Sequence, residues 1–309
     1  MLAGFFNTRY EGRTMSLFTE FPEMTRTELR DFKKAIDGSF KDFIHAYGEG
    51  IENFFKPLLY FLKWFEDLLV GTPWPIMLAI IALLVWAGSR SVFLVIGTII
   101  SMLLIGYLGM WEDAMFTLAL TTVATLICIV IGIPLGILMA KSNRLQAAIT
   151  PVLDVMQTIP AFVYLIPIVM ILGIGLVPGL IAVTIYAVPP VVRLTNLGIR
   201  LVDADILEAA DAFGASPRQK LWSVQLPLAL PNIFAGVNQT IMMALAMVVV
   251  ASLLGVHGLG LEVLKAVNSQ YITLGFMNGL AIVAIAIVFD RTSQKFGKRL
   301  QKHSEVIHG

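Results

Sequence analysis

Residues 115–140 read MFTLALTTVATLICIVIGIPLGILMA and include no charged side chain. An α-helix needs roughly 20 apolar residues to cross a hydrocarbon core that is ~30 Å thick. The stretch therefore predicts a membrane-spanning helix. It is also long enough to tilt in the bilayer or to project beyond it.

The composition of the whole chain agrees with that stretch. Of 309 residues, 57% are hydrophobic and 14% are charged, and the mean hydropathy is +0.82. Soluble domains carry about a quarter charged residues, so a soluble enzyme is excluded. A net charge of +1 gives no indication of a nucleic-acid partner. The single cysteine, Cys128, excludes an internal disulfide and a cysteine metal cluster.

Further apolar segments flank the opening stretch on both sides. Together with residues 115–140 they predict an all-α polytopic membrane protein with about seven transmembrane helices. The additional predicted spans are 73–88, 91–109, 152–173, 176–197, 228–255 and 273–289.

Residues 51–72 are rejected as a span, because a charge at the centre of the membrane costs about 2.5–3.5 kcal/mol. The charged residues are Glu52, Lys56, Lys63, Glu66 and Asp67. Apolar residues recur between them at helical spacing: Ile51, Phe54, Phe55, Leu58, Leu62, Phe65 and Leu69. Two readings stay open, an amphipathic helix in the membrane interface and a helix packed on the bundle.

Basic residues in alternate connections set the orientation. The connections that hold Arg90, then Lys141 and Arg144, then Arg200, Arg218 and Lys220, and the segment from Arg291 onward, are placed in the cytoplasm. With seven spans, the N-terminus lies outside and the C-terminus inside. The expected organisation is an external polar tail (1–50), an interfacial amphipathic helix (51–72), two spans (73–110), a five-span core (111–290) and a cytoplasmic basic tail (291–309).

Chemistry-bearing residues are scarce inside the predicted spans. Asp154, Arg193, Asp290 and Arg291 fall near the inner boundary, and no Asp, Glu, Lys, Arg or His lies deeper. This counts against a proton-coupled secondary carrier. No His, Asp or Glu cluster has metal or acid–base spacing, which counts against a membrane-embedded enzyme. The chain also has no GxxxxGK[ST] phosphate loop, so ATP is not expected to bind to it.

Uncharged polar residues accompany the prolines and glycines of the later spans. They are candidates for a neutral translocation pathway, although the same residue types also form hydrogen bonds between membrane helices. The candidates are Gln157, Thr158, Asn196, Asn238, Gln239 and Thr240.

The longest predicted cytoplasmic connection reads LVDADILEAADAFGASPRQKLWSVQLPLALPNI, residues 201–233. It predicts two short helices, the first capped by Asp203 or Asp205 and ended by Gly214. Ser216 caps the second helix, and Pro217 occupies its first position. Two short helices that project from the membrane in this way are suited to docking into a groove of another protein. An ordinary amphipathic loop helix is the alternative.

The motif Glu208-Ala209-Ala210, followed by Gly214 and by Leu226-Pro227, resembles the EAA loop of ABC importer permeases. The resemblance implies that the loop at 203–227 seats in an ATPase subunit. The residues that match are Asp205, Glu208, Ala209, Ala210, Phe213, Gly214, Pro217 and Pro227. Two positions depart from the family pattern, Gln225 and His257.

The strings MQTIPAFVYLIPIVMILGIG and MVVVASLLGVHGLGLEVL are similar to the glycine betaine/proline betaine permease class. The resemblance covers roughly residues 115–290 and implies a MetI-like permease core in a bacterial inner membrane. It further implies a second permease copy, ATPase subunits that bind ATP and Mg²⁺, and an external binding protein that delivers a quaternary amine. Choline, carnitine and trimethylamine N-oxide stay open as alternative substrates.

Overall fold

A computed structural model describes residues 24–308, without the side chains of residues 300–308. Residues 1–23 of the expected external tail, and the Lys302 side chain of the basic tail, therefore lie outside the described part. The contacts divide the chain into two units, residues 1–50 and 51–309. The described residues form helices and no strands. An all-α fold is thus confirmed.

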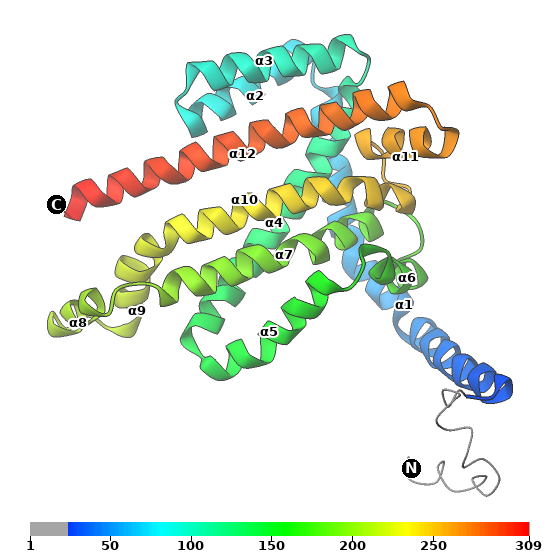
Figure 1. The fold of residues 1–309 in the computed structure, drawn as a ribbon, viewed down its shortest axis with the longest axis horizontal. Helices are drawn as coiled ribbons and strands as arrows, with labels where there is room; N and C mark the ends of the chain where they lie inside the picture. Colours follow the sequence, from blue (N-terminus) through cyan, green and yellow to red (C-terminus); the bar gives the residue numbers. More distant parts are fainter. Residues whose placement is uncertain (1–23, 309) are drawn as a thin grey trace, which may run out of the picture. The chain divides into compact units, whose positions relative to one another are not determined.

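The elements follow one another with short connections (Figure 1). They are α1 (Arg26–Gly71), α2 (Trp74–Ser89), α3 (Val92–Tyr107), α4 (Trp111–Lys141), α5 (Asn143–Thr158), α6 (Ala161–Leu172), α7 (Leu176–Arg200), α8 (Ala204–Ala212), α9 (Pro217–Gln219), a π-helical turn (Lys220–Gln225), α10 (Leu226–Ala251), a 3-10 turn (Ser252–Leu254), α11 (Leu259–Ser269) and α12 (Ile272–His308).

Four stretches of the described chain are long and apolar enough to cross a membrane as single helices. They are Trp111–Lys141, Leu176–Arg200, Pro217–Leu254 and Ile272–Arg299, and they coincide with four of the predicted spans. Predicted span 91–109 corresponds to the 16-residue helix α3. The other two predicted spans, 73–88 and 152–173, belong to helix pairs that bend sharply.

The predicted span at 152–173 is not a single straight helix, because the chain turns by 99° between α5 and α6. The break lies at Ile159 and Pro160. A residue before proline is driven out of the helical conformation, and Ile159 has ψ 129°. The Tyr164 hydroxyl donates to the carbonyl oxygens of Met156 and Ile159, at 3.2 and 3.1 Å. These bonds occupy backbone groups that the break leaves without helical partners.

Residues 51–71, the C-terminal part of α1, pack on the bundle with one side only. Leu62 is fully buried, and Leu58 and Phe65 pack against the largest apolar cluster of the protein. Aromatic residues such as Trp64 stay exposed on other sides of the helix. The structure therefore supports the packed reading of this segment. Contact with the membrane interface stays a prediction.

The centre of the bundle is α7, which lies between α4 and α10 (Figure 1). Glycines allow this close approach. A Cβ atom at Gly136 of α4 would lie 2.7 Å from the carbonyl oxygen of Val192, and one at Gly236 of α10 would lie 3.0 Å from the Cα of Val191. Small residues at helix crossings are typical of membrane bundles, where van der Waals packing holds the helices together.

A second layer forms where α2 and α3 lie beside α12 (Figure 1). Met77 of α2 and Met102 of α3 belong to the same buried cluster as Ile285 of α12 and Leu245 of α10. The two N-terminal apolar helices are therefore attached to the core mainly through α12, with a smaller contact between α3 and α4.

Candidate functional site

The loop between α7 and α10 begins with a capped helix. The Asp203 carboxylate accepts a hydrogen bond from the backbone N–H of Asp205, at 3.0 Å, and so caps α8. The sequence left Asp203 and Asp205 as alternative caps, and in the structure Asp203 is the residue that caps the helix. Asp205 lies in the first turn, where a negative charge is favoured by the helix dipole.

Helix α8 ends at Gly214 through two backbone hydrogen bonds. The Ala215 N–H donates to the Ala210 carbonyl at 3.0 Å, and the Gly214 N–H donates to the Asp211 carbonyl at 2.9 Å. This pair is the Schellman arrangement, which needs a residue with positive φ, and Gly214 has φ +74°. The predicted end of the helix is confirmed. A Cβ atom at Gly214 would meet nothing within 4 Å in this chain.

The second part of the loop begins with a capping box. The Ser216 hydroxyl accepts from the Gln219 N–H at 3.3 Å, and the Gln219 side chain accepts from the Ser216 N–H at 2.8 Å. Pro217 occupies the first helical position, as predicted. The prediction of a separate short helix is wrong, however. The helix continues from Pro217 through the π-helical turn into α10, with Pro227 at the start of α10.

This continuity gives the loop a direct connection to a spanning helix, because Pro217–Leu254 forms one candidate span. An ion pair joins the π-helical turn to α8. Lys220 Nζ lies 2.5 and 2.7 Å from the two carboxylate oxygens of Asp211. A displacement of α8 would therefore be transmitted to the beginning of α10.

The described residues leave the outer side of α8 uncovered. None of its residues is buried, Glu208 and Ala209 are exposed, and Phe213 keeps 92% of its surface accessible. Ala210 is partly buried. Exposed apolar surface next to a rigid capped helix is typical of a docking site for another protein.

Arg200 fixes the last turn of α7 just before the loop. Its guanidinium donates to the side-chain oxygen of Asn196 at 3.0 Å, to that of Asn143 at 2.8 Å and to the Met139 carbonyl at 2.8 Å. The contacts join α7 to the C-terminal end of α4 and the beginning of α5. The sequence indicated Arg200 only as a basic residue of an inner connection, because two of its three partners, Asn143 and Met139, lie more than 50 positions away.

Candidate pathway residues occupy three helices. Gln157 and Thr158 are exposed at the end of α5, and Asn196 of α7 is buried and bound to Arg200. In α10, Gln239 is exposed, whereas Thr240 is fully buried and its hydroxyl has no hydrogen-bond partner in the described part of the chain. Among the described residues, no hydrogen bond joins any two of the six candidates.

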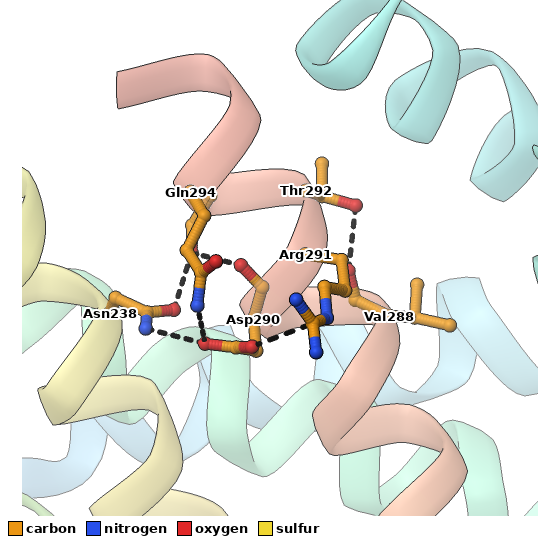
Figure 2. A network of polar contacts seen from close by, with 7 residues as sticks. Asn238, Val288, Asp290, Arg291, Thr292 and Gln294 are labelled. Carbon is orange, nitrogen blue, oxygen red and sulfur yellow. Dashed lines mark hydrogen bonds and ion pairs between the residues drawn. The ribbon is translucent and has the colours of Figure 1, made fainter. Parts of the chain in front are cut away.

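Asn238, the remaining candidate, lies in a polar network between α10 and α12 (Figure 2). Its amide nitrogen donates to Asp290 Oδ1 at 2.6 Å, and its amide oxygen accepts from the Ser293 hydroxyl. Gln294 donates to the same Asp290 oxygen at 2.7 Å. These contacts match the alternative reading, hydrogen bonding between helices. A role on the pathway stays a prediction.

The other end of the bundle carries α11, away from α8 and α9 (Figure 1). The backbone N–H of Leu259 donates to the hydroxyl of Thr117 at 3.0 Å and so attaches this connection to α4. Lys265 donates to Glu262 at 2.6 Å, and this hydrogen bond raises the pKa of Lys265. His257 is exposed beside the Phe116 ring.

Within residues 24–308, no group of three or more His, Cys, Asp or Glu side chains lies close enough together to hold a metal ion.

Comparison with known proteins identifies a family. The sequence profile described as "Binding-protein-dependent transport system inner membrane component" matches residues 132–302. The glycine betaine/proline betaine transport system permease protein ProW of Escherichia coli is 51% identical, over 78% of this chain and 68% of its own length. The glycine betaine/carnitine transport permease protein GbuB of Listeria monocytogenes is 46% identical, over 86% of this chain and 94% of its own.

Two further proteins extend the comparison. The glycine betaine transport system permease protein OpuAB of Bacillus subtilis is 48% identical, over 71% of this chain and 78% of its own length. An inward-facing structure of the MetNI methionine ABC transporter has a similar fold, with a TM-score of 0.56 and 22% identity. It covers 62% of this chain and 95% of the compared chain.

Proposed function

Because the chain belongs to the family of binding-protein-dependent inner membrane transport components, we propose that it moves glycine betaine or proline betaine across the inner membrane. The chain is a multi-pass permease subunit of an ABC transporter, and not an enzyme itself. Similarity to three permeases that are named for glycine betaine transport, at 46–51% identity, carries the choice of substrate.

Carnitine is the second candidate substrate, since GbuB is named for both glycine betaine and carnitine. Both compounds carry a quaternary ammonium and a carboxylate. A zwitterion of this kind has no net charge, so the spans need no compensating buried ion pair for it. Choline and trimethylamine N-oxide remain less favoured alternatives.

ABC permeases of this family work with ATPase subunits and a substrate-binding protein. We propose that this chain assembles as two copies, surrounded by membrane lipid, with ATP and Mg²⁺ bound on the ATPase chains. The N-terminus is placed outside and the C-terminus in the cytoplasm, which puts α8 on the same side as the ATPase.

Helix α8 is proposed to seat in the ATPase, with Glu208, Ala209 and Phe213 at the contact. ATP binding and hydrolysis can shift the permease only through contacts that differ between two states. Three features support this assignment: the exposed face of α8, the fixed turn at Gly214, and the unbroken helix from Pro217 into a span. A movement of the ATPase would then tilt α10.

Reconstituted transport tests the proposed substrate. The permease is co-expressed with its ATPase and binding protein, placed in liposomes, and supplied with labelled glycine betaine and ATP. The proposal expects ATP-dependent uptake that unlabelled proline betaine reduces by competition. ATP-dependent uptake of choline without any uptake of glycine betaine would overturn the substrate assignment. It would leave the permease assignment intact.

A further inference from the structure

An ion pair joins α5 to α7 within the predicted spans. Arg193 Nη2 of α7 lies 2.6 Å from Asp154 Oδ1 of α5. Arg193 lies seven residues before Arg200, the last residue of α7. Seven residues correspond to about 10 Å of helix, or roughly two turns. The pair is therefore placed inside the span and not at its end.

Both partners of the pair are partly exposed and have unused bonding capacity. The side chains of Arg193 and Asp154 keep 36% and 54% of their surface accessible. Their hydrogen bond uses one guanidinium nitrogen and one carboxylate oxygen. Arg193 Nε is buried and has no hydrogen-bond partner within residues 24–308. Because a guanidinium binds a carboxylate best through two parallel N–H groups, Arg193 can accommodate a further anion.

Helix α5 has three distinct sides when its residues are arranged at 3.6 per turn. One side packs on the bundle through Leu145, Ile149, Leu153 and Met156. A second side is apolar and exposed, with Ala148, Val152 and Val155. The third side carries Asp154 and has only polar or small residues, namely Ala147, Thr150, Pro151, Asp154, Gln157 and Thr158. Two of the candidate pathway residues therefore share a side of the helix with the ion pair.

The polar side of α5 is not suited to contact with lipid. Charged side chains within membrane spans face the interior of a bundle or a water-filled cavity, and they mark substrate pathways. Asp154 is half-exposed, so its surroundings must supply water or polar groups. Asn143, the first residue of α5, binds Arg200 immediately before the loop that carries α8. The polar side therefore borders a route that leads to the α8 end of the bundle.

We propose that Arg193 and Asp154 bind the two charged groups of the substrate on its way to the cytoplasm. This inference rests on the proposed function, transport of glycine betaine or a similar zwitterion. The substrate carboxylate replaces Asp154 on the guanidinium of Arg193, and the quaternary ammonium pairs with Asp154. Every charge keeps a partner during the exchange, so no isolated charge is left within the span.

The same pair determines which compounds the permease prefers. Choline carries the quaternary ammonium but no carboxylate, so its binding to Asp154 would leave Arg193 without an anion. An unpaired charge in a region of low dielectric constant is costly. A site that is built to bond one group of its substrate rejects an analogue that lacks this group. The permease itself, apart from its binding protein, therefore selects zwitterions over cations.

The test measures ligand binding to the permease–ATPase complex without the binding protein, whose own selectivity would otherwise enter. Nanodiscs of phosphatidylethanolamine and phosphatidylglycerol are used, because these lipids have no choline headgroup. Saturation-transfer NMR follows the N-methyl protons of glycine betaine and of choline. Glycine betaine should bind more tightly by about tenfold, which is the typical effect of one hydrogen bond to a charged group. Equal binding of the two ligands by the parent complex would overturn the proposal.

Arg193→Gln should reverse this preference. The variant frees Asp154 for the quaternary ammonium and leaves no cation for the carboxylate, so choline should bind more tightly than glycine betaine. Arg144→Gln is the matched control, because it removes an exposed positive charge from the beginning of the same helix and should keep the preference of the parent. An unchanged preference in Arg193→Gln would overturn the proposal.

Arg193→Lys separates substrate binding from a purely structural ion pair. Lysine keeps the charge but lacks the two parallel donors. Its unfolding temperature should equal that of the parent, while its preference for glycine betaine should shrink. Equal loss of both ligands together with a lower unfolding temperature would show a structural pair only. In the reconstituted transporter, uptake of glycine betaine by Arg193→Gln at the parent rate would refute this inference alone. No uptake by the parent would refute the proposed function instead.

Discussion

The loop around α8 and the α4–α7–α10 contact are both organised by glycine, but in opposite ways. Gly214 has open space around it and is required for its positive φ. Gly136 lies in a regular helix and is required because a neighbouring backbone leaves no space for a side chain. One region is fixed by local hydrogen bonds and left exposed to a partner, and the other by close packing. Substitutions in the α8 loop should therefore disrupt coupling to the ATPase, whereas substitutions at the α4–α7–α10 contact should disrupt folding.

The largest effect is expected from Gly136→Leu. Overpacking of a tight core costs about 1–3 kcal/mol and occasionally more, and here the obstacle includes backbone. The variant should give little folded permease and no transport, measured by thermal unfolding and by uptake. Gly97→Leu in α3 is the control, since a Cβ atom there meets nothing within 4 Å. Equal stability of the two variants would contradict the packing account.

Gly214→Val should abolish transport while the permease still folds and inserts. A β-branched residue at positive φ costs roughly 1–2 kcal/mol or more, and this cost is confined to the loop. The expected signs are lost co-purification of the ATPase, or ATP hydrolysis that loaded binding protein no longer stimulates. Gly214→Asn is the matched control, because asparagine tolerates positive φ. If asparagine also abolishes coupling, then close approach of the partner, and not φ, demands glycine.

Glu208→Lys should reduce transport less severely. The side chain is exposed at the proposed contact, so the reversal should leave the melting temperature of the permease unchanged. Coupling free energies between sites are typically about 1–3 kcal/mol, which corresponds to roughly 5–150-fold in binding affinity, so the affinity for the ATPase should fall within that range. Uptake and stimulated ATP hydrolysis measure the loss. Undiminished values for both Gly214→Val and Glu208→Lys would exclude α8 as the coupling helix.

Asn238→Leu should lower transport and leave assembly intact. Gln294→Leu is the control that separates a role on the pathway from a loss of hydrogen bonding to Asp290. Each variant removes one hydrogen bond to Asp290, and Asn238→Leu also removes the bond that Ser293 donates. One intramolecular hydrogen bond contributes about 0.5–1.5 kcal/mol, so Asn238→Leu should be the less stable of the two by about that amount. Loss of transport in Asn238→Leu alone, with its assembly intact, supports a place on the pathway. Normal transport by Asn238→Leu would remove the residue from the pathway and leave it as a link between α10 and α12.

The smallest effect is expected from Lys220→Met, which removes the ion pair with Asp211. The Asp211 side chain is more than half exposed, and pairs of this kind contribute about 0–1 kcal/mol. Transport should stay near the parent rate, because the capping box and the turn at Gly214 still fix the loop. A loss as large as that of Gly214→Val would mean that the ion pair holds α8 in place.

The contrast between local hydrogen bonds and close packing also explains which features could be predicted from the sequence and which could not. Caps and helix ends are local, so Gly214, Ser216 and Pro217 could be assigned from neighbouring residues alone. The ties of Arg200 to Asn143, and of Asn238 to Asp290, join distant positions, and periodicity carries no information about such pairs. The bend at Pro160 was visible as a proline, but its angle depends on packing around Tyr164.

Crosslinking between this chain and the ATPase tests the central claim, that α8 is the contact through which ATP drives the permease. Cysteine replaces Ala209 on the exposed side of α8, or Lys298 near the end of α12 as the control. The native Cys128 is buried and does not compete for the reagent. A short bifunctional maleimide should link residue 209 to the ATPase in the assembled transporter, with a yield that changes when ATP is bound. A link from residue 298 and none from residue 209 would contradict the account.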